Sequence, residues 1–287
     1  MKYWDAELLI KKVLKKLVII LEKSLPANAF DAFYKSLFPV YKELVRCLYF
    51  LKGFLYCRIT MNKDEWAMTK DICRIMPYSL VGVGGLKVTY NSVKDVCERD
   101  IPGDIVELGV ARGGCSALMA NVVFDKMIGR QMDRKLWLFD SYEGLPECTA
   151  MDLNPNLGNG TGEHVRPLLK GSCLGKLDEV KDLMFNKNNF PRERVEFVKG
   201  WFENTLPKTR EKIKQIAVLR IDADWYESTK SCLVNLYDKV CSGGYVIVDD
   251  YHSCYGCRRA VDEFLQDRHI VPVVKFDGRG GCYFKKV

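Results

Sequence analysis

From Asp104 onward, short β-rich runs alternate with helical stretches, and this alternation constrains the fold more than any other feature of the chain. The candidate strands are 104–108, 135–139, 195–198, 216–221, 244–248, 271–275 and 281–285, and helical patterns lie near 114–127, 173–187, 227–240 and 257–268. This order is typical of an α/β fold in which helices cover both faces of a mostly parallel sheet. A Gly-rich turn between the last two runs predicts a hairpin, and therefore an antiparallel strand at the sheet edge.

The first hundred residues have a different pattern, so we expect a helical region over 1–100 and a main domain over 101–287. Residues 6–23 and 27–57 carry apolar side chains at helical spacing. The following stretch, 61–100, predicts a helical lead-in broken by three glycines, Gly82, Gly84 and Gly85.

The helical N-terminal region allows two interpretations. Its apolar run Leu44–Tyr56 contains Arg46 and Lys52, and it is shorter than the roughly 20 apolar residues that a membrane span needs. One interpretation is a cap that packs on the main domain or builds a homo-oligomer. The other is a basic amphipathic helix in peripheral contact with a membrane surface through residues 1–60.

The net charge of +7 is concentrated near the N-terminus, because residues 1–60 hold 11 Lys and Arg against 5 Asp and Glu. The remaining 33 basic and 32 acidic residues nearly balance. An enzyme that acts on nucleic acid should carry its positive charge around the active site, so we expect no nucleic-acid partner.

Twelve cysteines are scattered along the chain, and no secretory signal opens it. This usage predicts reduced thiols in a cytoplasmic protein. Cys254 and Cys257 form a CxxC pair, but we find no second ligand pair at the spacing of a zinc site, so we interpret this motif as incidental.

The first strand runs into a glycine-rich turn, Glu107-Leu-Gly109-Val-Ala111-Arg-Gly113-Gly114. Glycine permits a tight turn and a close approach of the backbone to a ligand. The pattern differs from the G-x-G-x-x-G of dinucleotide-binding folds and places an acid beside the loop. An acid there suits the cationic ammonium and sulfonium groups of S-adenosylmethionine (AdoMet). The alternative is a turn that only packs a helix on a strand.

The second strand ends in Phe139-Asp140-Ser141. An acid at this position of an α/β sheet can hold the hydroxyl groups of a ribose. Asp140 is therefore a candidate cofactor residue, and a turn or helix-capping role is the alternative.

Three further acids follow the fourth and fifth strands: Asp222, Asp249 and Asp250. In a parallel sheet these strand ends can be neighbours, and three unpaired carboxylates would repel one another. A bound Mg²⁺ would resolve the repulsion, because it prefers hard oxygen ligands. The alternative is that these acids cap helices. His252 follows the pair Asp249-Asp250 and is a candidate general base for proton transfer.

Residues 104–268 resemble the macrocin O-methyltransferase family of macrolide and aminocoumarin biosynthesis. The matching stretches are DIVELGVARGG, LFDSYEGLPE, VKGWFENTLP, LRIDADWYEST, GGYVIVDDY and RRAVDEF. The resemblance implies a class I, Rossmann-like methyltransferase that uses AdoMet and Mg²⁺ to methylate a sugar hydroxyl. It also implies that Asp222, Asp249 and Asp250 are metal ligands and that Asp222 is the general base. Glu107, Gly109 and Asp140 match AdoMet-binding positions.

The predicted cofactor site comprises Glu107, Gly109, Ala111, Gly113, Asp140, Ser141 and Trp201. Trp201 follows the third strand, where it could flank the adenine or belong to the core. The long segment 147–171 contains Asn-Pro-Asn-Leu-Gly-Asn-Gly-Thr-Gly and predicts a lid over the cleft, with a surface insertion as the alternative.

Other function classes fit the motifs less well. An NAD-dependent oxidoreductase would show the G-x-G-x-x-G motif, which is missing after the first strand of this chain. A nucleic-acid amino-methyltransferase would show Asn/Asp-Pro-Pro-aromatic after the fourth strand, where this chain has Asp222-Ala-Asp224-Trp225. A non-catalytic scaffold need not retain the acidic cluster. The sequence therefore predicts a small-molecule O-methyltransferase that acts on a sugar. The alternatives are a non-sugar acceptor such as a catechol, or a nucleic-acid methyltransferase.

Overall fold

The computed structural model describes residues 20–21, 24–125, 133–156 and 168–287. Within this part of the chain, seven strands form one sheet in the order β3-β2-β1-β4-β5-β7-β6. Strands β1 to β5 pair in parallel, and β7 pairs antiparallel with both β5 and β6, which confirms the predicted sheet. Their bounds are β1 Asp104–Leu108, β2 Leu136–Asp140, β3 Val195–Lys199, β4 Ile216–Ile221, β5 Val240–Val248, β6 Lys275–Phe276 and β7 Cys282–Lys285.

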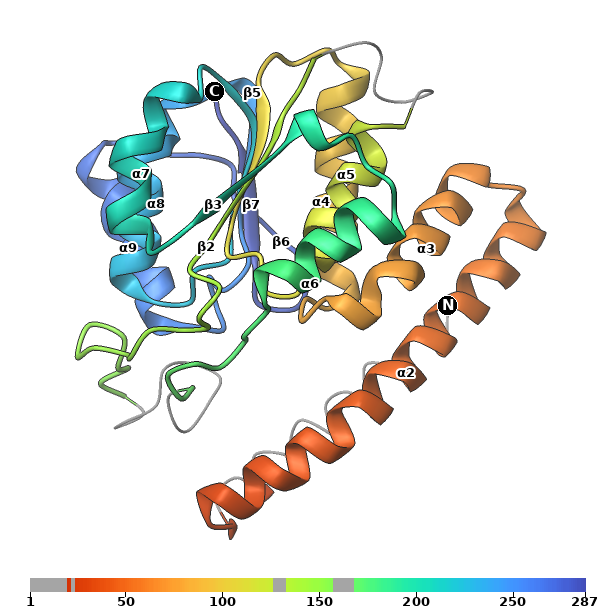
Figure 1. The fold of residues 1–287 in the computed structure, drawn as a ribbon, viewed down its shortest axis with the longest axis horizontal. Helices are drawn as coiled ribbons and strands as arrows, with labels where there is room; N and C mark the ends of the chain where they lie inside the picture. The colour runs from red at the N-terminus through yellow and green to blue at the C-terminus, as the bar shows by residue number, and fades with distance from the viewer. Residues whose placement is uncertain (1–19, 22–23, 126–132, 157–167) are drawn as a thin grey trace.

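Helices cover both faces of the sheet (Figure 1). One face carries α7 Phe202–Thr209, α8 Tyr226–Leu236 and α9 Tyr255–Asp267. The other carries α3 Lys63–Ile75, α4 Val83–Glu98, α5 Gly114–Val123 and α6 Leu177–Lys181, which continues into a π-helical turn, Asp182–Lys187. The long helix α2, Ala27–Thr60, lies outside this layer.

Two apolar clusters hold these layers together, one on each face of the sheet. Alternate residues of a strand point to opposite faces, and β1 accordingly sends Ile105 into one cluster and Val106 into the other. Every residue of the central strand β4 is buried. The apolar core on both faces of the sheet therefore fixes the positions of the strand ends relative to one another.

Helix α2 packs along one side on α3. Phe50 and Phe54 contact the ring of Trp66, with ring centroids 5.2 and 5.9 Å away, and Gly53 faces Thr69. Among the described helices, none is long and apolar enough to cross a membrane. The helix predicted over 6–23 lies almost wholly outside the described residues.

Two local predictions were wrong in part. The helical lead-in is broken before α4, with Gly82 as the extended residue that precedes the helix, but Gly84 and Gly85 lie in the first turn of α4. A Cβ on Gly84 would overlap the carbonyl oxygen of Asp277, so glycine permits a close approach of the β6–β7 turn. The strand predicted over 271–275 is reduced to Lys275–Phe276. The strand β6 lies at the edge of the sheet, where among the described strands it pairs with β7 alone, and Val271 and Val273 before it are exposed.

We predict that Gly53→Val loosens α2 from α3. A Cβ at this position would lie 2.5 Å from Thr69 Cγ2, and such overpacking typically costs about 1–3 kcal/mol. The neighbouring Lys52 is exposed, so Lys52→Val is the matched control. Its cost should be clearly smaller than that of Gly53→Val, because a side chain at an exposed position overlaps no buried atom. Chemical denaturation gives both values, and equal stabilities would contradict the packing described for α2.

Candidate active site

Strand register brings the predicted acids to one edge of the sheet. Leu108 of β1 is level with Ile221 of β4, which is level with Val248 of β5. The backbone N–H of Asp222 donates to Leu108 O at 2.8 Å, and that of Asp249 donates to Ile221 O at 2.9 Å. The ladder thus continues one residue past the strands. Carboxylate oxygens of Asp222, Asp249 and Asp250 all lie within 4.8 Å of one another.

A buried guanidinium group lies beneath this cluster. Arg220 is wholly inaccessible and forms ion pairs with carboxylates that follow or belong to three strands. Its Nη1 lies 2.9 Å from Asp222 and 3.4 Å from Glu107, and its Nη2 lies 3.0 Å from Asp249. A buried cation is tolerated only when it is paired in this way. Arg220 therefore fixes the spacing between β1, β4 and β5 at their carboxyl ends.

The acids nevertheless outnumber the cations that contact them. Arg279 adds one contact, 3.2 Å from Asp249 Oδ2. Asp250 Oδ1 accepts from Ser253 Oγ at 3.0 Å, whereas its buried Oδ2 has no hydrogen-bond partner. Burial first, and then the neighbouring carboxylates, raises the pKa of both Asp249 and Asp250. The cluster therefore favours an additional positive charge.

The donor set fits a hard divalent cation such as Mg²⁺. It offers oxygen ligands alone, and Asp250 Oδ2 is a buried acceptor without a partner. Contacts with arginine do not exclude Asp222 and Asp249, because an ionised carboxylate has about four lone-pair sites. The three acids therefore fit the Mg²⁺ ion that the sequence predicts.

The glycine-rich loop between β1 and α5 lies beside the acids. Gly109 has a φ of +91°, and a Cβ there would overlap the Asp222 carbonyl oxygen. Gly113 also has a positive φ, and a Cβ on it would lie 2.8 Å from Val180 Cγ1. Both glycines make the tight turn that was predicted, and the close approach that they permit here is to the protein itself.

Asp140 organises this loop. Its Oδ2 accepts the backbone N–H groups of Val110 at 2.7 Å and Ala111 at 3.0 Å, and its Oδ1 accepts that of Tyr142 at 2.6 Å. Burial raises the pKa of Asp140 against these three hydrogen bonds. Ser141 forms a local turn with Glu143 and Gly144. The side chain of Asp140 is only partly buried and keeps lone pairs for another donor.

Glu107 lies below the loop, not on its surface. It is wholly buried, and its carboxylate accepts from Ser116 Oγ and pairs with Arg220. Burial raises its pKa to about 8, with Arg220 and Ser116 acting in the opposite direction. In this conformation Glu107 supports the loop from inside the sheet.

Trp201 is the residue before α7 and lines a cavity of about 550 Å³. Trp225 and Pro146 line the same cavity, and the Trp225 indole N–H donates to Pro146 O at 3.1 Å. The residues that line this cavity include none of the other predicted cofactor residues, so the role of Trp201 beside the adenine stays a prediction.

Both described ends of the segment 147–171 are anchored. Gly171 N donates to Leu145 O at 2.9 Å near the far end. At the near end the buried Asp152 accepts from Tyr226 N at 2.7 Å and so caps α8. The sequence did not identify Asp152. Residues 157–167, at the centre of the predicted lid, lie outside the described part.

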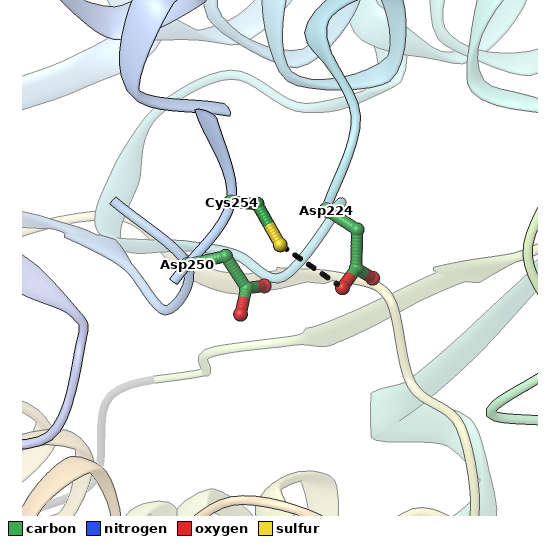
Figure 2. Close-up of side chains that lie close together, drawn as sticks. All are labelled: Asp224, Asp250 and Cys254. Carbon is green, nitrogen blue, oxygen red and sulfur yellow. Dashed lines mark hydrogen bonds between the residues drawn. The ribbon is translucent and has the colours of Figure 1, made fainter. Parts of the chain in front are cut away.

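The sequence also singles out His252 and Cys254, which follow the acids after β5. The ring of His252 packs on Phe276 with centroids 4.8 Å apart, at the exposed sheet edge. Cys254, interpreted from the sequence as incidental, is buried beside Asp224 and Asp250 (Figure 2). Ligand atoms of these three residues also lie within 4.8 Å of one another. The CxxC spacing gave no signal for this group, because its other two members follow different strands.

Comparisons with known proteins agree with this architecture. The family model described as macrocin-O-methyltransferase matches residues 38–286. Demethyldecarbamoylnovobiocin O-methyltransferase of Streptomyces niveus is 36% identical over 210 residues, which cover 73% of this chain and 76% of that protein. The 8-demethyl-8-(2,3-dimethoxy-alpha-L-rhamnosyl)-tetracenomycin-C 4'-O-methyltransferase of Streptomyces olivaceus is 34% identical and covers 71% and 74%.

The solved structure of the O-methyltransferase NovP is similar in fold. It is 36% identical, with a TM-score of 0.63 over 73% of this chain and 82% of that one. The sheet order and the helices on both faces define a class I methyltransferase. The chain belongs to the macrocin O-methyltransferase family and is an O-methyltransferase, which confirms the resemblance stated above.

We predict that Glu107 makes the folded state less stable as pH rises. Its folded pKa of about 8 exceeds its ordinary value of 4.5, so between these values the folded state holds a proton that the unfolded state has lost. Stability should therefore fall from about pH 5 to pH 8, by at most about 1.4 kcal/mol per unit for this group. Glu107→Gln should make the slope shallower. Urea denaturation in chelator over this range measures it, and identical slopes would contradict the assignment.

Proposed function

We propose that this enzyme transfers the methyl group of AdoMet to a sugar hydroxyl, with Mg²⁺ held by Asp222, Asp249 and Asp250. The observation that carries the metal assignment is the convergence of these carboxylates around the unpartnered Asp250 Oδ2. The sugar acceptor is inferred from the name of the Streptomyces olivaceus relative, which denotes 4'-O-methylation of a rhamnosyl-tetracenomycin. The name of the Streptomyces niveus relative denotes O-methylation of demethyldecarbamoylnovobiocin.

AdoMet would lie over the carboxyl ends of β1 and β2. The backbone of Gly109, Ala111 and Gly113 would face it, and the free lone pairs of Asp140 would accept a ribose hydroxyl. Ser141 would hold the turn after β2, and Trp201 would cover the adenine. Glu107, which is wholly buried, would act by supporting the loop. When bound, AdoMet supplies an electrophilic methyl group.

The acid cluster would prepare the acceptor. When bound, Mg²⁺ lowers the pKa of a neighbouring hydroxyl group and positions it. Asp222 would accept the hydroxyl proton, since it is the least buried of the three acids. The acceptor oxygen forms a bond to the methyl carbon as the carbon–sulfur bond breaks, so the positive charge of the donor is lost. Arg220 would keep Asp222 in place by its 2.9 Å ion pair.

We also propose a cytoplasmic location, supported by twelve cysteines that are all unpaired.

A second proposal concerns self-association through α2. Of the twelve large apolar residues described as exposed in this helix, Phe50, Phe54 and Tyr56 lie elsewhere on its surface. The other nine are between 36% and 82% exposed and lie on one side: Phe33, Leu37, Val40, Tyr41, Leu44, Leu48, Leu51, Leu55 and Ile59. At 3.6 residues per turn they share an arc of about 100°. Arg58, five turns along from Val40 and therefore at the edge of the arc, is the one charged residue of α2 that falls within it.

The opposite side of α2 packs on the main domain through Val45, Tyr49 and Gly53. The apolar stripe therefore faces away from the chain's own core. Its residues recur every three or four positions over most of a 34-residue helix, as in pairs of packed helices. We propose that a second copy of this chain covers the stripe, as the expected homo-oligomer requires.

Leu48→Glu should convert a dimer into a monomer, because it places a charge in the middle of the stripe. Lys52 is exposed next to the arc, so Lys52→Glu is the control and should remain dimeric. Analytical ultracentrifugation of the full chain measures both. A wild-type protein that is monomeric at all concentrations would contradict the proposal. Salt-sensitive binding to anionic vesicles would then assign the stripe to a membrane surface.

We predict that Asp250→Asn abolishes most methyl transfer while AdoMet binding persists. The substitution removes a ligand from the metal but touches none of the proposed AdoMet contacts. Asp222→Asn should behave likewise and resist rescue by excess Mg²⁺, because it also removes the base. The exposed Asp267, at the end of α9, gives the control variant Asp267→Asn.

The assay is transfer of labelled methyl to a panel of sugars and nucleotide sugars over a range of Mg²⁺ concentrations, with calorimetry for AdoMet. Full turnover in chelator, or wild-type turnover by Asp250→Asn, would return these acids to a structural role.

A further inference from the structure

A second group of ligand atoms lies next to the proposed Mg²⁺ site, formed by Asp224, Asp250 and Cys254 (Figure 2). Asp224 follows β4, Asp250 follows β5, and Cys254 is the residue before α9. The thiol of Cys254 donates to Asp224 Oδ1 over 3.8 Å. The three side chains thus come from separate segments and point toward one another.

The backbone holds this group in place. Cys254 N donates to Asp250 O at 2.9 Å, which fixes the turn between the acid and the thiol. Asp224 has a left-handed φ of +54°, a conformation that Asp and Asn tolerate better than most residues. The arrangement is therefore built before any ligand binds.

One buried polar atom of the group has no hydrogen-bond partner. Asp250 is 9% exposed, and its Oδ2 has no hydrogen-bond partner. Among the described residues, Arg220 pairs with Glu107, Asp222 and Asp249, and Arg279 pairs with Asp249. Neither arginine forms an ion pair with Asp224 or Asp250 in that part of the chain. A buried acceptor in this state points to an absent cation.

We propose that Asp224, Asp250 and Cys254 form a second cation site, selective for a thiophilic divalent metal such as Zn²⁺. Zn²⁺ takes one sulfur and two carboxylate oxygens readily, whereas Mg²⁺ prefers oxygen alone. On binding, the metal–sulfur bond replaces the S–H bond, and the proton is released to solvent.

This site regulates the proposed reaction because it shares Asp250 with the Mg²⁺ ligands. An ion held by Cys254 draws Asp250 away from Asp222 and Asp249. Zn²⁺ should therefore inhibit methyl transfer at concentrations far below those of Mg²⁺. This part rests on the proposed function, whereas thiophilic binding itself does not.

The direct test uses Cd²⁺ as the probe, without AdoMet, acceptor or Mg²⁺. Titration into the full chain should give the ultraviolet thiolate-to-metal charge-transfer band. Cys254→Ser should remove a high-affinity component of this band. Loss of a supporting partner already weakens metal sites by roughly 10–100-fold, so loss of this ligand should weaken Cd²⁺ binding at least about 100-fold. Cys47→Ser, on the exposed side of α2, should retain the component.

A second variant allows the proposal to be tested even if Cys254→Ser does not fold. Asp224→Asn keeps the left-handed backbone conformation and removes a ligand charge, so it should weaken Cd²⁺ binding by at least about 10-fold. If Cys257→Ala removes the band while Asp224→Asn retains it, the metal belongs to the CxxC pair and the proposal is overturned. An unchanged band in Cys254→Ser also overturns it. Cd²⁺ binding that depends on Cys254, without inhibition by Zn²⁺, would uphold the site and reject only its competition with Mg²⁺.

Discussion

The active-site edge of this protein depends on one buried cation. Arg220 has no exposed surface and contacts Glu107, Asp222 and Asp249, which belong to or follow β1, β4 and β5. Breaking a buried network of this kind leaves charges without partners, and this typically costs about 3–5 kcal/mol. The same contacts keep three carboxylates closer together than their mutual repulsion would otherwise allow. The ion pairs of Arg220 therefore both join the strand ends and bring together the acids of the proposed metal site.

The arginine contacts do not extend over the whole cluster. They reach Asp222 and Asp249 but leave Asp250 Oδ2 without a partner. This asymmetry is what makes the site suited to a divalent cation. It also accounts for two overlapping ligand sets, one of oxygen atoms alone and one that includes the Cys254 thiol. Selectivity between metals then depends on which set holds Asp250.

The sequence predicted much of the sheet and the meeting of Asp222 with Asp249 and Asp250, because parallel strands align the residues that follow them. It did not predict the role of Arg220, because an arginine within IAVLRI gives no sign that acids from neighbouring strands will surround it. Gly84 was misread for a similar reason, since the backbone it approaches lies far along the chain at Asp277. Contacts set by tertiary structure leave no local pattern. Asp140 was predicted as a candidate cofactor residue, but its bonds to the loop backbone became evident only from the fold.

The central claim is that the strand-end carboxylates hold a divalent cation. Anomalous diffraction from crystals grown with Mn²⁺, which prefers similar oxygen ligands, tests it directly. The account predicts an anomalous peak within bonding distance of carboxylate oxygens of Asp222, Asp249 and Asp250, with Arg220 still paired beneath them. Crystals that hold Mn²⁺ elsewhere, or none at all, with Asp250 Oδ2 bonded to another protein group, would contradict it.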